Sequence, residues 1–368
     1  MLHVQQYLKD GKTLTQLTAD FGIKTCFHPT EPLVILNYDQ IESPKTHPIV
    51  RECRGLVLHA ETFDLVAKGF DRFFNEGEAY ELTKDFDWSN PVDIRTKEDG
   101  SYINLFNYDG RILITTRGSW ADGECGFSGK TWAEIVTRLL PDPFKLNMVE
   151  YLSEGTNLIF ELCSMHNKVV RSYPEAKLVL LGGTVLGTEV DPEHLDGFAR
   201  TWGFDRPERH LCGTIDAVKE LIDRKAAGDA TWEGVVLRDV NGMRLKVKSA
   251  AYVSLHHMRG EGDNLYHPRY IIPFILKGEQ AEVLTYFPEI KDRLDEVEDK
   301  VNELYDELIH YYSVSYGITD QKEFALTIRG CRLSSILFRL KKECRLTFED
   351  INAEVRDASD QFYKILYR

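Results

Sequence analysis

The alternation of apolar and polar residues divides the chain into two parts. From about residue 30 to residue 260, short β-type runs alternate with turn signals, whereas residues 275–368 have a mainly helical pattern. The change falls near Gly260-Glu261-Gly262-Asp263. We therefore predict a first domain of residues 1–260 and a second domain of residues 261–368.

Turn dipeptides predict two hairpins in the first part. Asp109-Gly110 separates Tyr102–Asn107 from Arg111–Thr116, and Asn241-Gly242 separates Val235–Arg238 from Met243–Lys248. Further strands are predicted at Leu33–Asn37, Gly55–His59, Leu158–Leu162 and Leu178–Leu181, and helices at Trp132–Leu140 and Ile215–Lys225. This order of elements indicates an α+β domain with an antiparallel sheet.

The second part carries one long apolar stripe. Its members recur at 3-4-3-4 spacing with charged residues between them, and they are Leu294, Val297, Val301, Leu304 and Leu308. This spacing predicts an amphipathic helix in an all-helical domain. Two heptads are few for a coiled coil. We therefore favour a helix packed within its own domain over a dimer seam, and a monomer over an oligomer.

Composition narrows the class of protein. With 43% apolar and 28% charged residues, the 368-residue chain is typical of a soluble globular protein. It has neither an apolar run long enough to span a bilayer nor a secretory signal at its start, so we expect a cytoplasmic protein, in the host cytoplasm if it is phage-encoded. The seven cysteines include no C-x-x-C pair, and the histidines lack metal-ligand spacing. A metal ion, if present, should be bound by carboxylates.

The net charge of −14 argues against a protein that coats nucleic acid non-specifically, because such binding depends on a basic surface. An enzyme with a local basic site remains compatible with this charge, since a cleft with a few cations can be strongly positive.

One lysine has acidic neighbours in a turn-like segment. Thr96-Lys97-Glu98-Asp99-Gly100-Ser101 lies between a run that ends at Ile94 and the first predicted hairpin. Taken alone, K-x-D-G is a short pattern that arises by chance in many proteins, and Lys97 is then a solvated charge. Its interpretation depends on residues elsewhere in the chain.

Two further lysines share one face of a predicted strand. In Arg244-Leu245-Lys246-Val247-Lys248, side chains alternate, so Lys246 and Lys248 point away from the side of Leu245 and Val247. On a solvent-facing side this pair is unremarkable, but in a cleft it suits a polyphosphate.

A nucleophilic lysine must be neutral, although its ordinary pKa is about 10.4. We expect neighbouring cations, a metal ion or burial to lower the pKa of Lys97.

Two acids complete the set of candidate residues. Glu161 interrupts the apolar run Leu158–Leu162, where a charge must be paired, hydrogen-bonded or directed into a cleft. Glu233 begins the second hairpin. These carboxylates suit a ribose hydroxyl and a Mg²⁺ ion, which prefers oxygen ligands shared with phosphates. For Glu161 a buried salt bridge is the alternative.

Taken in order, these segments resemble the motifs of the covalent nucleotidyltransferases, which include ATP-dependent DNA ligases, RNA ligases and mRNA capping enzymes. The matching segments are Lys97-Glu98-Asp99-Gly100, Phe160-Glu161, Glu233-Gly234 and Lys246-Val247-Lys248. A narrower similarity to the bacteriophage RNA ligase 1 family rests on Glu52-Cys53-Arg54-Gly55, Phe73-Phe74-Asn75, Arg117-Gly118-Ser119 and the run from Lys246 to His256. The resemblance covers residues 35–260. It implies an antiparallel-sheet nucleotidyltransferase (adenylation) domain followed by helices.

This resemblance implies an ATP-dependent RNA ligase. Lys97 would take AMP from ATP, the AMP would pass to an RNA 5′-phosphate, and a 3′-hydroxyl would then displace it. The implied catalytic residues are Lys97, Lys246 and Lys248, and Glu233 would bind Mg²⁺, with Mn²⁺ as an alternative. The implied nucleotide-binding residues are Tyr38, Arg54, Arg72, Phe74, Lys97, Gly100, Arg117, Glu161, Glu233, Lys246 and Lys248.

Within this set the resemblance assigns separate contacts. Arg54 and Arg72 would bind the outer phosphates, Glu161 the ribose, and Lys246 and Lys248 the α-phosphate. Phe74 would be a wall of the adenosine pocket or part of the core. The chain departs from the family pattern at Arg72 and Arg117, where lysine is frequent. The charge is kept, but a guanidinium is a planar fork rather than a point charge.

Other functions remain open from the sequence. A DNA ligase or capping-type enzyme is disfavoured because no OB-fold pattern follows Lys248. A non-catalytic RNA-end-binding protein is the alternative from another class, but all the motif residues are present. The expected partners are RNA with single-stranded or broken tRNA ends, ATP, and a separate kinase or phosphatase that prepares the ends.

Overall fold

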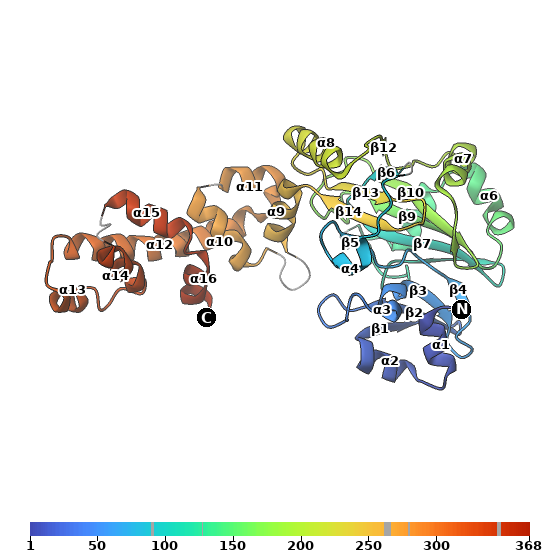
Figure 1. The fold of residues 1–368 in the computed structure, drawn as a ribbon, viewed down its shortest axis with the longest axis horizontal. Coiled ribbons are helices and arrows are strands. Elements are labelled where there is room, and N and C mark those ends of the chain that lie inside the picture. Colours follow the sequence, from blue (N-terminus) through green and yellow to red (C-terminus); the bar gives the residue numbers. More distant parts are fainter. Residues whose placement is uncertain (90–91, 127, 261–265, 279, 344–346) are drawn as a thin grey trace. The chain divides into compact units, whose positions relative to one another are not determined.

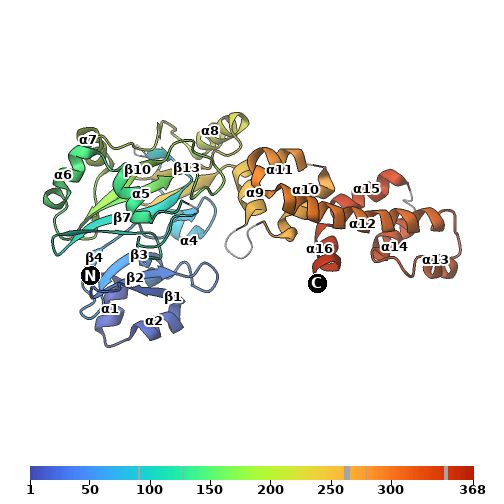
Figure 2. The same ribbon diagram turned by 180° about the vertical axis from the view of Figure 1, so that it is seen from behind.

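The chain folds into two compact units, Met1–Tyr252 and Val253–Arg368 (Figures 1 and 2). The computed structural model describes residues 1–368 except 90–91, 127, 261–265, 279 and 344–346. The sequence places the domain join at Gly260–Asp263, of which residues 261–263 lie outside the described residues.

The first unit contains three sheets. The first sheet has the order β1-β2-β3-β4 (Ile23–Phe27, Leu33–Tyr38, Arg54–His59, Leu65–Ala67) and is antiparallel throughout. The second has the order β12-β6-β13-β14-β5 (Arg209–His210, Asp93–Thr96, Gly234–Arg238, Arg244–Lys248, Phe74–Asn75). The third has the order β11-β10-β9-β7-β8 (Thr188–Glu189, Lys177–Val185, Thr156–Cys163, Ser101–Tyr108, Arg111–Thr115). Among the paired strands that the structure describes, β14 and β5 alone run parallel.

Both predicted hairpins are confirmed. β7 pairs with β8, and β13 with β14, in antiparallel registers. Asp109 and Gly110 both have positive φ, which is the geometry of the two-residue turn that matches strand twist. The antiparallel α+β class predicted for this part is therefore correct.

Helices cover the outer faces of the second and third sheets. The helices of this unit are α1 (His3–Lys9), α2 (Leu14–Phe21), α3 (Pro48–Glu52), α4 (Tyr80–Thr83), α5 (Trp132–Leu139), α6 (Asp142–Tyr151), α7 (Pro192–Trp202) and α8 (Ile215–Gly228). Side chains of α5, α6 and α7 pack on the third sheet, and those of α8 pack on the second. The predicted helices at Trp132–Leu140 and Ile215–Lys225 match α5 and α8.

Local sequence explains where α5 starts. Thr131 accepts a hydrogen bond from the backbone N–H of Glu134, and the Glu134 carboxylate accepts one from the N–H of Thr131. This reciprocal pair satisfies two backbone donors that a helix start otherwise leaves open.

The second unit contains helices only, among its described residues. They are α9 (Ala250–Arg259, which starts in the first unit), α10 (Pro268–Lys277), α11 (Gln280–Tyr286), the short 3₁₀ helix η2 (Pro288–Ile290), α12 (Lys291–Ser315), α13 (Gln321–Thr327), α14 (Ser334–Lys342), α15 (Phe348–Arg356) and α16 (Ser359–Tyr367). The predicted stripe lies on α12, and its five residues are at most 2% exposed. Because α10 and α16 pack against α12, this stripe is buried inside its own unit rather than left as a dimer seam.

Within the part of the chain that the structure describes, no helix combines the length and apolar character needed to cross a bilayer.

Candidate active site

The central strands of the second sheet bring three lysines and one acid together. Lys97 directly follows β6, Glu233 directly precedes β13, and Lys248 ends β14. Glu233 bridges the two lysines, since its Oε2 lies 2.7 Å from Lys97 Nζ and its Oε1 lies 2.8 Å from Lys248 Nζ. The Lys97 N–H also donates to the carbonyl of Gly234 at 2.8 Å. The sheet order therefore joins two motifs that are far apart in the sequence.

The predicted alternation on β14 is confirmed. Leu245 and Val247 are buried in the core beneath α8, so Lys246 and Lys248 point to the opposite side, toward Lys97. Burial lowers the pKa of Lys246 to about 7, and the nearby positive charges of Lys97 and Arg72 contribute to this shift. Lys246 is therefore partly neutral near pH 7 in the nucleotide-free protein, chiefly because it is buried.

The expected lowering of the Lys97 pKa is wrong for the nucleotide-free protein. Burial alone would lower this pKa, but the negative charges of Glu233 and Glu161 outweigh it, and the pKa of Lys97 is raised. The same attraction holds the pKa of Glu233 below its usual value despite burial. Lys97 is thus held as a cation, and it must lose a proton before it can act as a nucleophile.

Glu161 faces the space between the second and third sheets. It lies on β9 opposite Tyr102 of β7, and its Oε1 accepts a hydrogen bond from the N–H of Gly100 at 3.1 Å. A side chain at Gly100 would collide with the carbonyl of Leu162, so the close approach of this turn to β9 needs glycine. Burial raises the pKa of Glu161 to about 7, with the charge of Glu233 adding to the shift.

The raised pKa of Glu161 predicts that the free energy of unfolding depends on pH. The folded protein holds a proton on Glu161 that the unfolded chain has released, so its contribution to stability falls as pH rises from about 4.5 to about 7. We expect the Glu161→Gln variant to match the wild type at pH 4.5 and to be more stable by about 1–2 kcal/mol at pH 8. Urea denaturation at both pH values measures this difference. A variant less stable at pH 8 would contradict it.

The arginines of the set lie on aromatic rings. The guanidinium of Arg72 is 5.3 Å from the ring centroid of Tyr38 and 5.0 Å from that of Phe74, and Arg117 is 5.8 Å from Tyr38. Arg72 also donates to the Tyr38 hydroxyl at 3.2 Å. Despite burial, the nearby arginines lower the pKa of Tyr38. Tyr38 therefore belongs to the same cluster as Arg72 and Arg117.

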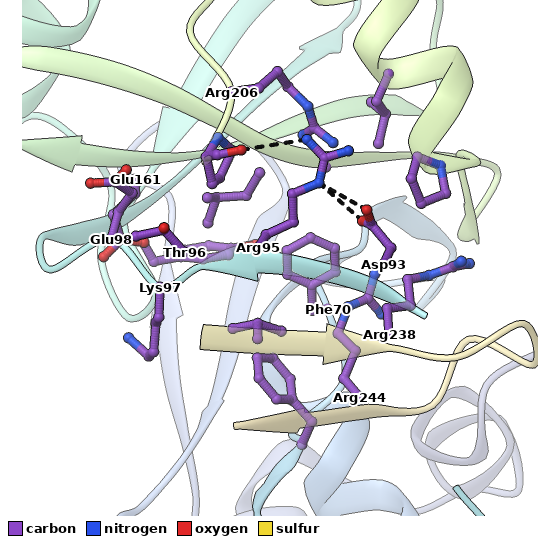
Figure 3. A pocket seen from close by; sticks show the side chains of 18 of the residues that line it. Phe70, Asp93, Arg95, Thr96, Lys97, Glu98, Glu161, Arg206, Arg238 and Arg244 are labelled. Atoms are coloured by element: carbon purple, nitrogen blue, oxygen red, sulfur yellow. Dashed lines mark hydrogen bonds and ion pairs between the residues drawn. The ribbon is translucent and has the colours of Figure 1, made fainter. Parts of the chain in front are cut away.

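A cavity of about 110 Å³ lies between the second and third sheets. Figure 3 shows Lys97 and Glu161 at one end and Arg238 and Arg244 at the other. Arg54 also lines it, whereas Tyr38, Arg72, Arg117, Glu233, Lys246 and Lys248 do not. Phe74 lines a second cavity, also of about 110 Å³, together with Arg72. Phe70 and Phe73, not Phe74, are the phenylalanines on the wall of the cavity that holds Lys97.

The charged end of this cavity was not identified from the sequence. Arg244 makes two hydrogen bonds of 2.6 and 2.7 Å with the carboxylate of Glu189, and Arg95 contacts Asp93 and Asp196. Arg244, Arg95 and Asp93 line the cavity, whereas Glu189 and Asp196 hold the two arginines from outside its lining. None of these residues belongs to a sequence motif, and only the pairing of distant strands brings them together.

Asp99 ties the lysine turn to distant segments. Its Oδ2 accepts hydrogen bonds from the N–H groups of Val170 and Arg171 at 2.8 and 2.6 Å, and its Oδ1 accepts one from the Tyr252 hydroxyl at 2.7 Å. Asp99 is only 4% exposed. Asp99 belongs to the lysine motif recognised in the sequence. The three groups that donate hydrogen bonds to its carboxylate lie at least 71 residues away, so no local pattern predicts them.

Removing this carboxylate will destabilise the first unit. We expect Asp99→Ala to lower the free energy of unfolding by about 3 kcal/mol, because it leaves two backbone donors and a buried hydroxyl without an acceptor. Tyr252→Phe is the matched control, since it removes one of these bonds and should cost about 1 kcal/mol. Equal losses in the two variants would show that the backbone donors do not matter.

Comparison with known proteins identifies the family. The family model described as RNA ligase matches residues 52–252, which include the lysine turn, Glu161, Glu233 and the lysines of β14. The chain belongs to the RNA ligase family. The resemblance found in the motifs is thereby confirmed.

Curated relatives of this member of the RNA ligase family include proteins from a virus and a bacterium. A protein of Autographa californica nuclear polyhedrosis virus, named as a bifunctional polynucleotide kinase/RNA ligase, is 27% identical over 379 residues, covering 99% of this chain and 52% of the relative. A protein of Thermovibrio ammonificans named as an RNA ligase is 26% identical over 238 residues, covering 61% of this chain and 58% of the relative. The chain thus spans about half the length of these relatives.

A solved structure shares the fold. An archaeal ATP-dependent RNA ligase aligns over 90% of this chain and 89% of its own, with a TM-score of 0.50 and 16% identity. This similarity confirms the predicted fold, a nucleotidyltransferase domain with antiparallel sheets and a helical C-terminal region.

Proposed function

We propose that this protein is an ATP-dependent RNA ligase that seals a 5′-phosphate RNA end to a 3′-hydroxyl end. The bridge from Lys97 through Glu233 to Lys248 is the observation that carries the proposal. It places a potential nucleophile, a carboxylate for a metal ion and a phosphate-binding cation within hydrogen-bonding distance. Membership of the RNA ligase family supports the choice of RNA.

In the first step the Lys97 amine attacks the α-phosphorus of ATP. A nitrogen–phosphorus bond forms, the bond to the β-phosphate oxygen breaks, and pyrophosphate leaves. Lys97 loses two of its three ammonium protons to solvent, one before the attack and one as the nitrogen–phosphorus bond forms, and the raised pKa makes the rate of adenylation increase with pH. Lys246 and Lys248 stabilise the charge that develops on the α-phosphate.

In the next two steps AMP passes to an RNA 5′-phosphate oxygen, and a 3′-hydroxyl then displaces AMP to form the phosphodiester. Arg54, Arg72 and Arg117 bind the outer phosphates of ATP, and Glu161 binds the ribose. Tyr38 positions Arg72 and Arg117, whereas Gly100 allows the lysine turn to approach Glu161. Phe74 supports Arg72 rather than the adenosine.

The acidic residues fit a divalent ion shared with ATP. Mg²⁺ is commonly bound by one or two carboxylates together with substrate phosphates. Among the described residues no cluster of three metal-ligating side chains forms a complete protein cage. Glu233, buried beside Lys97, suits such a shared site, so we expect it to bind Mg²⁺ or Mn²⁺. When bound, the ion would neutralise phosphate charge.

The substrate test uses protein that has been incubated with ATP and Mg²⁺ and freed of nucleotide. We expect AMP to transfer to 5′-phosphorylated single-stranded RNA and the strand to be sealed, with no transfer to DNA of the same sequence. Transfer to DNA only would assign a DNA ligase. ATP binding without transfer would assign a non-catalytic RNA-end-binding protein.

Broken tRNA is a candidate natural substrate, and the helical domain predicted over residues 261–368 is the candidate RNA-recognition region. We expect RNA with a 5′-hydroxyl to need a separate kinase before it can be joined. Sealing of such RNA by the purified protein alone would contradict this expectation.

A further inference from the structure

Phe73 lies between two cations of the site. Arg54 is 5.7 Å and Lys246 is 5.3 Å from the centroid of its ring. Both distances fall within the range in which an aromatic face attracts a cation. Phe73 also lies on the wall of the cavity that holds Lys97.

The chain path explains how one ring meets both cations. Phe73 directly precedes β5, which pairs in parallel with β14, so that Asn75 lies opposite Lys246. On the other side, the N–H of Arg72 donates to the carbonyl of Arg51, just before Arg54. The segment that carries Phe73 therefore connects the first sheet with the second.

Arg54 and Lys246 also differ from the other cations of the site. Glu233 pairs with Lys97 and with Lys248, and Glu78 pairs with Arg72 at 2.8 Å. Among the described residues neither Arg54 nor Lys246 has a carboxylate within 4 Å. The Phe73 ring is the feature that both cations share, although the Tyr102 ring also lies 5.3 Å from Arg54, and the charges of Glu161 and Glu78 act on Arg54 and Lys246 from a greater distance.

A ring holds a cation differently from a carboxylate. It attracts the face of a guanidinium and leaves the N–H donors in the plane free for phosphate oxygens. A carboxylate would occupy those donors and would have to be displaced by ATP. The aromatic contact can therefore persist when a phosphate binds.

We propose that Phe73 is a positioning residue that holds Arg54 and Lys246 over its ring, ready for the phosphates of ATP. The inference rests on the proposed function for the identity of the ligand. It does not require that Phe73 itself touch ATP.

The test replaces Phe73 with phenylalanine analogues that carry one, two or three ring fluorines. Fluorination weakens the negative face of the ring while nearly keeping its shape. We measure the dissociation constant of ATP by calorimetry, together with the rate of adenylation. ATP binding should weaken stepwise, by about tenfold at three fluorines, as expected for two partly desolvated cations on one ring.

The same series at Phe144 is the control. Phe144 is fully buried in the core of the third sheet, among aromatic neighbours. Its fluorination should leave ATP binding unchanged. Thermal denaturation of each variant checks that the fold is retained.

The outcomes separate this inference from the proposed function. Unchanged or tighter ATP binding across the Phe73 series overturns the positioning role, whatever the wild type catalyses. A stepwise weakening without any adenylation in the wild type supports the role of Phe73 and overturns the ligase reaction.

Discussion

Replacing Lys97 with alanine will abolish the transfer of AMP from ATP to the protein. Alanine carries no amine that could attack the α-phosphorus. We therefore expect the rate of adduct formation to fall to the detection limit, by at least about 10³-fold, as is typical when an essential nucleophile is removed. The fold should be retained, because Glu233 keeps its 2.8 Å contact with Lys248. Radiolabelled ATP and gel analysis of the denatured protein measure the adduct.

Lys177→Ala is the matched control for this variant. Lys177 also pairs with an acid of the lysine turn, since its Nζ lies 3.1 Å from Glu98 Oε2, but it does not line the cavity that holds Lys97. It should form the adduct at the wild-type level. Wild-type adduct in a folded Lys97→Ala protein would refute the assignment of the nucleophile.

The second large effect is expected at Glu233. Glu233→Gln keeps the shape of the side chain but removes the charge between Lys97 and Lys248, which are only 25% and 27% exposed. We expect the free energy of unfolding at pH 7 to fall by about 2–4 kcal/mol, because two ammonium groups lose their shared counter-ion. Adenylation should fall at least 100-fold, since the carboxylate that suits the metal ion is lost.

The stability difference between Glu233→Gln and the wild type should also depend on pH, through the pKa of Lys97. In the wild type the raised pKa of Lys97 stabilises the folded protein below about pH 10.5, and this contribution is lost as pH rises further. Without the Glu233 charge, burial should lower the pKa of Lys97 instead. The variant should therefore gain stability relative to the wild type between about pH 8 and pH 10.

A double variant separates charge balance from catalysis. Glu233→Gln combined with Lys248→Met removes one surplus cation, so much of the stability should return while adenylation stays lost. Urea denaturation and the adduct assay measure the two effects. If the single variant is as stable as the wild type and adenylates normally, the bridge has no role in the site.

Local patterns predicted much of the fold. The Asp109-Gly110 and Asn241-Gly242 turns gave both hairpins because such dipeptides favour turn conformations that match strand twist. The apolar stripe predicted the long helix α12 with one buried face, because its spacing repeats with the helical turn. In contrast, β5 has two residues and its pairing with β14 depends on distant chain segments, so no local pattern marks it.

The site was predictable in its residue types but not in its electrostatics. Strand alternation correctly put Lys246 and Lys248 on one side of β14. The sign of the Lys97 pKa shift was missed, because it depends on Glu233, 136 residues away, whose contact follows from the order of β6, β13 and β14. Phe74 was assigned from the sequence either to the adenosine pocket or to the core; it is buried, and its neighbour Phe73 lines the cavity that contains Lys97.

The most direct test of the account is the intact mass of the purified protein before and after incubation with ATP and Mg²⁺, followed by peptide mapping. The account predicts a gain of one AMP per chain, attached to Lys97 and released when 5′-phosphorylated RNA is added. ATP binding without a mass change, or an adduct on another residue, would contradict it.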